Sequence, residues 1–164
     1  MKRILSIVVL AIAFSTTLMA QSENVTDKDL QGVWVMEWMQ WEGESKIVCG
    51  KKSSYGSFKY YGPTGEYACA ELALSKNGEV VVLPHEYGTY SFKNGAYVEM
   101  GRKQDLALVD KTHFRCIWTR RHEQWRKCTT LSEKTVRYII ESCKIHQGPS
   151  ADIQKSIIQN VFSE

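Results

Sequence analysis

The sequence predicts a single, mostly β domain: an up-and-down antiparallel barrel of eight or nine strands followed by one or two helices. Between residues 31 and 130, short alternating or aromatic-rich runs are separated by turn residues, a pattern typical of antiparallel sheets. After Leu131 the apolar residues change to helical spacing. A chain of 164 residues is long enough for one domain with a core, and too short for two once a leader is removed.

The N-terminus has the organisation of a secretory signal peptide. Two basic residues precede the apolar stretch 4–14, and small and polar residues follow it. The apolar stretch is too short to span a bilayer, which disfavours the alternative of a transmembrane anchor. We expect cleavage after Ala20, giving a signal peptide over 1–20 and a lipid-free mature domain over 21–164, because no cysteine lies near that point. The protein is therefore expected to be exported, periplasmic or secreted, and not a lipoprotein.

The mature part of the chain is nearly neutral. Two of the 21 lysines and arginines belong to the leader, so 19 basic residues face 18 acidic ones, a net charge of +1. This balance gives no electrostatic reason to expect a nucleic acid or an anionic membrane as partner. We expect neither nucleic-acid binding nor stable membrane insertion.

Turn residues divide the β region into strands expected at 31–41, 55–61, 66–74, 79–83, 87–93, 96–101, 105–109, 112–120 and 123–130. The strongest turn is Asn94-Gly95, because a type I′ hairpin needs positive φ at both central residues. His85, Glu86 and Tyr87 follow a proline and are expected in a surface loop.

The C-terminal segment over 131–164 is expected to be helical. Ser132 can cap a helix that carries one apolar stripe, and Gly148 can end it. A second helix can begin at Ser150. The two stripes are Val136, Ile139, Ile140 and Cys143, then Ile153, Ile157, Ile158 and Val161. Both should pack on the outside of the barrel or across one mouth, although 132–143 is β-branched enough for a last strand.

Five cysteines lie in the part of the chain expected to be exported, where disulfides persist. Two disulfides and one free thiol are expected, with the pairing open. The cysteines are Cys49, Cys69, Cys116, Cys128 and Cys143. No Cys-x-x-Cys or His-x-x-x-His spacing favours a structural metal, and haem bound through His113, His122 or Met36 lacks an attachment motif, so we expect no cofactor.

The opening of the first strand, Leu30-Gln31-Gly32-Val33-Trp34, looks like the Gly-x-Trp opening of lipocalins. Three further segments resemble secreted bacterial lipocalin-like domains of unknown function, which have a calycin-type barrel. They are 59–65 (Lys-Tyr-Tyr-Gly-Pro-Thr-Gly), 88–90 with 97–99, and 123–126 (Glu-Gln-Trp-Arg). The resemblance implies a lipocalin-like barrel with a cup-shaped interior, which in that superfamily often binds small apolar molecules. It transfers no ligand, because fold and function separate easily.

If Trp34 points inward, as the resemblance implies, alternation places Met36 and Trp38 on the same inner face. Packing as plain core is the alternative fate of these residues. Because the Asn94-Gly95 turn sets the register of its hairpin, Phe92 should face Tyr97, and Tyr90 should face Glu99.

A carboxylate among aromatic rings needs a cation or a proton, and Arg120 and Arg126 are the expected partners of Glu99. If a three-residue loop follows Arg120, Trp118 lies opposite Arg126, and Cys116 opposite Cys128, which would permit a cross-strand disulfide.

The sequence contains no Gly-x-Ser-x-Gly, no phosphate-binding glycine loop and no His-Glu-x-x-His, so we expect a protein that binds rather than catalyses. The first hypothesis is a small apolar ligand held in the barrel cavity. The alternative is a solidly packed barrel that acts as a protein interaction module in the envelope, through outer aromatics such as Trp41 and Tyr61. The candidate cavity residues are Trp34, Met36, Trp38, Tyr90, Phe92, Tyr97, Glu99, Trp118, Arg120 and Arg126.

Overall fold

The structure, a computed structural model, describes residues 26–50, 55–74, 76–77, 80–93, 96–145 and 159. The expected leader, the Asn94-Gly95 turn and nearly all of the expected second helix lie outside these residues. Within them, no helix is both long and apolar enough to cross a membrane.

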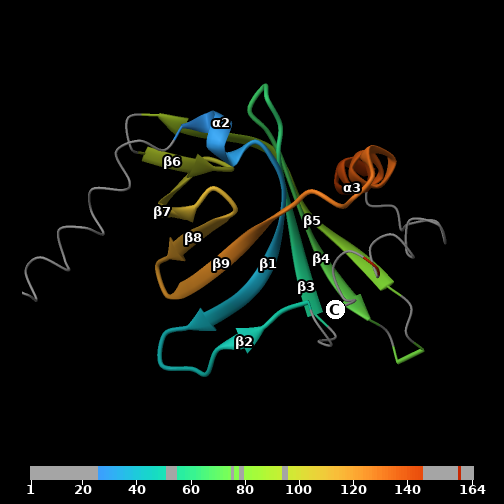
Figure 1. The fold of residues 1–164 in the computed structure, drawn as a ribbon, viewed down its shortest axis with the longest axis horizontal. Coiled ribbons are helices and arrows are strands. Elements are labelled where there is room, and N and C mark those ends of the chain that lie inside the picture. Colours follow the sequence, from blue (N-terminus) through green and yellow to red (C-terminus); the bar gives the residue numbers. More distant parts are fainter. Residues whose placement is uncertain are drawn as a thin grey trace, which may run out of the picture.

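The described strands form one antiparallel sheet in the order β2-β1-β3-β4-β5-β6-β7-β8-β9, and β1 also pairs with β9. The strands are β1 (Gly32–Trp41), β2 (Ile47–Val48), β3 (Tyr55–Tyr61), β4 (Glu66–Leu74), β5 (Val80–Lys93), β6 (Ala96–Glu99), β7 (Arg102–Asp110), β8 (His113–Trp118) and β9 (Arg121–Cys128). The pairing of β1 with β9 closes eight strands into a barrel, and β2 is an additional short strand on β1 (Figure 1). The expected up-and-down lipocalin-like barrel is confirmed.

Two buried clusters lie on the two faces of this sheet. The inner cluster fills much of the barrel with aromatic rings, among them Trp34, Tyr61 and Phe114. The outer cluster joins Phe58 and Leu72 of the barrel wall to the C-terminal helix. The alternation of side chains along each strand separates the two clusters.

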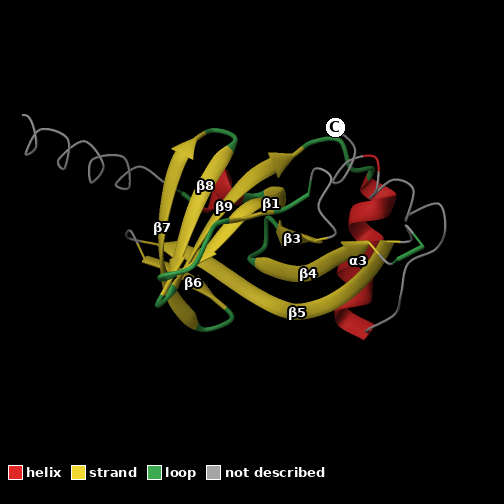
Figure 2. Ribbon diagram, turned by 90° about the horizontal axis from the view of Figure 1, so that it is seen from below, coloured by secondary structure: helices red, strands yellow, loops and turns green. Residues whose placement is uncertain are grey.

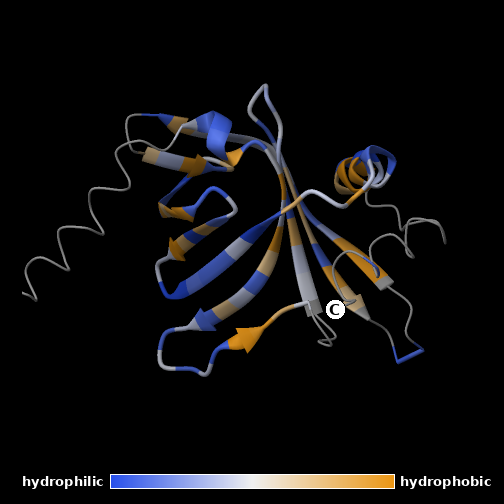
Figure 3. Ribbon diagram, in the orientation of Figure 1, coloured by the Kyte–Doolittle hydropathy of each residue, from blue (hydrophilic) through white to orange (hydrophobic). Residues whose placement is uncertain are grey.

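Helix α3 (Glu133–Ile145) packs on the outer face of β4 and β5, with its apolar residues turned towards the sheet (Figure 3). The expected stripe is buried at Ile139, Ile140 and Cys143. The Thr135 backbone N–H donates to Ser132 Oγ over 3.1 Å, which is the expected cap. The segment is therefore a helix, and the alternative of a last strand is wrong.

The short helix α2 (Asp27–Leu30) leads into the Gly-x-Trp opening, and the bend between them explains why this opening has a glycine and a tryptophan. Gly32 has φ +118°, a conformation that side chains rarely adopt. The bend lets the fully buried Trp34 donate its indole N–H to the Leu30 carbonyl over 2.7 Å. The opening thus fixes the start of β1 inside the barrel.

Strand β5 is longer than expected, because it joins the two predicted strands 79–83 and 87–93 into one curved strand (Figure 2). The register shifts between Cys69 and Ala70, which pair with Glu86 and Pro84, so His85 is an extra residue at a bulge. A bulge tolerates proline, which cannot donate a ladder hydrogen bond. The expected surface loop at His85, Glu86 and Tyr87 is therefore wrong.

A second irregularity changes the faces of β1. Met36 pairs with Trp125 and Trp38 pairs with Gln124, so Glu37 is inserted between them. The inner face therefore passes from Trp34 and Met36 to later odd-numbered residues. Trp38 does not line the barrel as expected, and instead lies near Lys46 Nζ at 4.2 Å and Arg115 at 5.7 Å from its ring centroid.

The hairpin between β8 and β9 also differs from the expectation. Its turn is Thr119-Arg120, with Trp118 opposite Arg121 and Cys116 opposite Glu123. The expected pairing differs by an odd number of positions, so Arg126 and Cys128 fall on the outer face instead of the inner one. The proposed alignment of Cys116 with Cys128 is therefore wrong.

All five cysteines are free thiols, against the expected two disulfides. Cys116 belongs to the inner cluster and Cys128 to the outer one, so the sheet separates them. Cys143 Sγ approaches the Cys69 carbonyl oxygen at 3.3 Å, yet the Cys69 side chain faces the barrel interior. Burial raises the pKa of Cys49 to about 11 and that of Cys69 to about 12.

We predict that the protein unfolded without reductant exposes five thiols to a thiol-reactive dye. The folded protein should react slowly at neutral pH, because burial limits access to the thiols and raises the pKa of Cys49, Cys69, Cys116 and Cys143. Electrospray mass measured before and after reduction provides the second readout. A count of one or three thiols, with a mass gain on reduction, would contradict the separation of the cysteines.

Candidate functional site

The barrel contains an open cup of about 470 Å³. Its walls come from β1, β3, β4 and β5, and from the ends of β6, β7, β8 and β9. The lining residues are Met36, Trp41, Ser57, Lys59, Tyr67, Cys69, Glu71, His85, Glu86, Glu99, Arg102, Trp118, Thr119, Arg120, Arg121, Glu123 and Trp125. Aromatic walls, charged groups at the floor and charged groups at the mouth together make the cup amphipathic.

A buried ion pair forms the floor of the cup. Lys59 Nζ on β3 lies 2.9 Å from Glu99 Oε2 and 3.2 Å from Glu99 Oε1, at the end of β6. The two residues are only 3% and 1% exposed. Glu123 Oε2 on β9 lies 3.9 Å from the same ammonium. The floor thus ties three strands of the barrel together.

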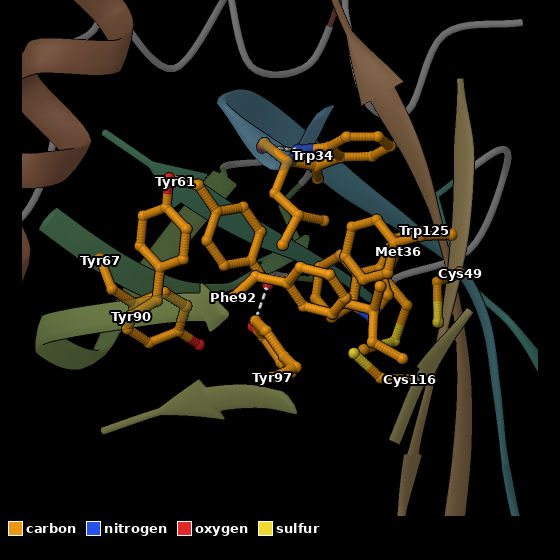
Figure 4. Packing of buried hydrophobic residues seen from close by; sticks show 13 residues of the cluster. Trp34, Met36, Cys49, Tyr61, Tyr67, Tyr90, Phe92, Tyr97, Cys116 and Trp125 are labelled. Atoms are coloured by element: carbon orange, nitrogen blue, oxygen red, sulfur yellow. Dashed lines mark hydrogen bonds between the residues drawn. The ribbon is translucent and has the colours of Figure 1, made fainter. Parts of the chain in front are cut away.

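Three tyrosines complete the hydrogen bonding of Glu99. Tyr67 Oη donates to Glu99 Oε1 over 2.8 Å, Tyr61 Oη donates to Oε2 over 3.2 Å, and Tyr97 also donates to Oε2. The hydroxyls of Tyr61 and Tyr97 lie 2.6 Å apart. Figure 4 shows these rings packed among Phe92, Tyr90 and Trp125. With these donors and the ammonium, the buried carboxylate has the partners that its ionised form requires.

The electrostatics of the floor favour the charged pair. Burial opposes ionisation of Glu99, but Lys59 and the tyrosine hydroxyls outweigh it and lower the pKa of Glu99. Burial likewise opposes the ammonium of Lys59, but Glu99, Cys116 and Glu123 raise the pKa of Lys59 above its ordinary value. Burial and the neighbouring carboxylate raise the pKa of Tyr61, Tyr67 and Tyr97 well above 10.

Glu123 connects the floor to the mouth. Its Oε2 accepts a hydrogen bond from Trp125 Nε1 over 2.9 Å, and its Oε1 lies 2.5 Å from the Arg121 guanidinium. Its side chain has no exposed surface. The carboxylate therefore holds an arginine at the mouth and an indole in the wall.

The mouth carries cations stacked over indole rings. Arg121 lies 5.2 Å from the ring centroid of Trp41 and 5.8 Å from that of Trp118. Arg102 lies 5.3 Å from the Trp118 centroid and also pairs with Glu86. These distances are those of cation–π contacts.

The expected register of the Asn94-Gly95 hairpin is confirmed, with Phe92 opposite Tyr97 and Tyr90 opposite Glu99. Of the candidate cavity residues, those that line the cup are Met36, Glu99, Trp118 and Arg120. Those buried in the inner cluster without lining the cup are Trp34, Tyr90, Phe92 and Tyr97. Trp38 and Arg126 lie outside the barrel.

The expected arginine partners of Glu99 are wrong. Arg120 lies in the hairpin turn, 3.5 Å from Glu42, and Arg126 lies 3.5 Å from Glu37 on the outer face. The partner is Lys59, which the sequence reasoning missed. Lys59 alternates with Ser57 and Tyr61 on one face of β3, whereas Phe58 and Tyr60 on the other face contact α3. This alternation is the sequence signal that could have placed Lys59 inside the barrel.

We predict that Glu99→Gln lowers the free energy of unfolding by about 3–5 kcal/mol, because it leaves the Lys59 ammonium buried without its charge partner. Urea midpoints measure the change. Glu133→Gln, on the exposed surface of α3, is the matched control and should leave the midpoint unchanged within error. A urea midpoint for Glu99→Gln equal to that of the control would show that the buried pair does not stabilise the barrel.

The same pair predicts how stability depends on pH. The folded-state pKa of Glu99 is lowered, so its contribution is complete above the ordinary value of 4.5 and is lost as pH falls through the folded-state pKa. The folded-state pKa of Lys59 is raised, so its contribution is complete below the ordinary value of 10.5 and is lost as pH rises through the folded-state pKa. Thermal midpoints should therefore fall at both extremes, and less steeply in Lys59→Met/Glu99→Leu. Identical profiles for the two proteins would contradict this.

No protein-family model matches the chain, and no curated protein does. Among solved structures, the chain is similar to a lipocalin-like protein from Bacteroides uniformis ATCC 8492, at 15% identity and a TM-score of 0.44. The match covers 60% of this chain and 98% of that one. The fold rests on the strand order and closure themselves: the chain forms a lipocalin-like barrel with an open cup.

Proposed function

We propose that this protein is an exported, non-catalytic carrier or sensor that holds a small molecule with an apolar body in the cup. The observation that carries the proposal is the cavity of about 470 Å³ inside a closed barrel. Sites for small molecules typically enclose about 300–1,000 Å³. Small barrels can also be filled by side chains, so a cavity of this size is not a necessary consequence of the fold.

The composition of the walls favours a ligand with apolar surface. Met36, Trp41, Trp118 and Trp125 line the cup. Trp41 is 41% exposed at the mouth, and the exposed apolar surface of such a large ring is costly to leave in water. A ligand that covers these rings would remove that apolar surface from water.

The chemical state of the polar groups argues against catalysis. Lys59 is held as an ammonium by Glu99, so it lacks the lone pair of a nucleophilic amine. Burial raises the pKa of the Cys69 thiol to about 12, so almost no thiolate is present at neutral pH. The groups at the floor are thus fixed in forms that bind and position rather than react.

The alternative of a solid interaction module has less support. That alternative predicts a barrel interior filled by side chains, whereas the barrel contains an open cup. Tyr61, expected on the outer surface, is fully buried in the inner cluster, and Trp41 lines the cup.

We predict that the neutral fluorescent probe N-phenyl-1-naphthylamine binds saturably, at about one molecule per protein, with emission shifted to the blue. Ser57→Phe should weaken this binding at least about tenfold, because Ser57 lines the cup and the added ring fills it. Ser91→Phe is the matched control, since Ser91 lies between the inward-facing Tyr90 and Phe92 and so faces outward. Thermal melts check that both variants fold. Equal affinities for the two variants would place the probe outside the cup.

Export is the second part of the proposal, and it is supported by the order of charged, apolar and small residues over 1–20. We predict that the full-length chain expressed in a bacterium is recovered in the periplasm or medium, beginning at Gln21. N-terminal sequencing and fractionation measure this. Uncut protein in the inner membrane or cytoplasm would contradict it.

A further inference from the structure

We propose that the cup selects an amphipathic anion: a carboxylate, phosphate or similar head group bound by three arginines at the mouth, with its apolar body against the tryptophans. We call Arg102, Arg120 and Arg121 the arginine rim. The inference rests on the proposed function and deepens it, because it names the chemical class of the ligand.

The topology of the barrel brings the arginine rim together. Arg102 is the first residue of β7, directly after the turn from β6. Arg120 and Arg121 lie at the turn from β8 to β9. In an up-and-down barrel, alternate turns lie at the same end, so these two turns meet at one mouth. All three side chains line the same cup.

Two of the three rim guanidiniums lie over indole rings. Arg102 and Arg121 both lie over Trp118, at 5.3 and 5.8 Å from its centroid, and Arg121 also lies over Trp41. A guanidinium stacked on a ring keeps its edge N–H groups available, and those groups match the geometry of carboxylate and phosphate oxygens. The guanidiniums of Arg102 and Arg121 are therefore positioned before a ligand arrives, whereas Arg120 is 75% exposed.

The rim has more hydrogen-bond donors than the described residues use. Each guanidinium carries five N–H donors. Within the described part of the chain, the rim makes one ion pair per arginine, with Glu86, Glu42 and Glu123 respectively.

A buried donor at the mouth favours the same class of ligand. Trp118 Nε1 is buried and has no hydrogen-bond partner among the residues that the structure describes. Arg121 Nε is also without a partner there, but the unpartnered acceptor Glu123 Oε1 lies beside the same guanidinium. Buried donors without partners are costly and uncommon in folded proteins, and an acceptor oxygen of a head group offers a partner for the Trp118 indole N–H.

The acidic residues of the cup do not cancel this preference. Glu99 is saturated by Lys59 and three tyrosines, and Glu123 has no exposed side-chain surface. Arg102 and Arg120 are 50% and 75% exposed, so an incoming head group meets the rim first. Glu86 is already paired with Arg102, so its charge is offset there.

The test is displacement of N-phenyl-1-naphthylamine by four ligands with the same dodecyl chain, each below its micelle concentration. They are dodecanol, dodecanoate, dodecyl phosphate and dodecyltrimethylammonium. At least one anion should bind about tenfold or more tightly than dodecanol, and the cation should bind most weakly. The anion that binds more tightly identifies the head group. Added salt should reduce the advantage of the anion and leave dodecanol unaffected.

Arg121→Gln should bring the affinity for the anion to within about threefold of the affinity for dodecanol, both measured on the same variant. Arg102→Gln is a second variant in case the first fails to fold, and Arg137→Gln, on the exposed face of α3, is the control. Equal affinity of anions and alcohol, or tighter binding of the cation, would overturn the inference while leaving the proposed function intact. If the neutral probe and all four chains fail to bind saturably, both are wrong.

Discussion

The buried pair between Lys59 and Glu99 is the interaction on which the rest of the structure depends. Removing two charges from water costs several kcal/mol per ion, and mutual attraction offsets this only when the remaining donors and acceptors are satisfied. Here that condition requires β3 and β6 to stay in register with β4, which supplies Tyr67, and with β9, which supplies Glu123. A slip of one residue in any of these strands would move its side chain to the other face. The pair thus couples distant strands of the barrel to one arrangement.

The same cluster explains why a compact barrel leaves a cup. Around Trp34, Tyr61 and Phe114 the interior is packed by aromatic rings at 4.6 and 6.1 Å between centroids. At the floor, charged and hydroxyl groups form a hydrogen-bonded layer in place of apolar side chains. Apolar side chains packed into this layer would leave its polar groups without hydrogen-bond partners. Beyond that layer lies the open cup. The amphipathic character of the cup, and therefore the class of ligand proposed for it, follows from this order of layers.

Local chemistry made part of this structure predictable from sequence. The Asn94-Gly95 pair gave the correct partners of Tyr90 and Phe92, because a two-residue turn determines register directly. The stripe of Ile139, Ile140 and Cys143 gave the helix. The bulge at Glu37 was not predictable, since an inserted residue needs no special side chain. The Thr119-Arg120 turn lacks the usual glycine or asparagine, and Lys59 meets Glu99 across 40 residues, a contact that no local pattern encodes.

Lys59 and Glu99 stabilise the barrel as a pair, and a double-mutant cycle measures this coupling. The free energies of unfolding of the wild type, Lys59→Met, Glu99→Leu and the double variant give the coupling between the two side chains. We expect each single change to lower the free energy of unfolding by about 3 kcal/mol or more, and the double variant to lose less than the sum of the two, with a coupling of about 2–3 kcal/mol. Losses that add to within about 0.5 kcal/mol would show that the two side chains act independently, and would contradict the account.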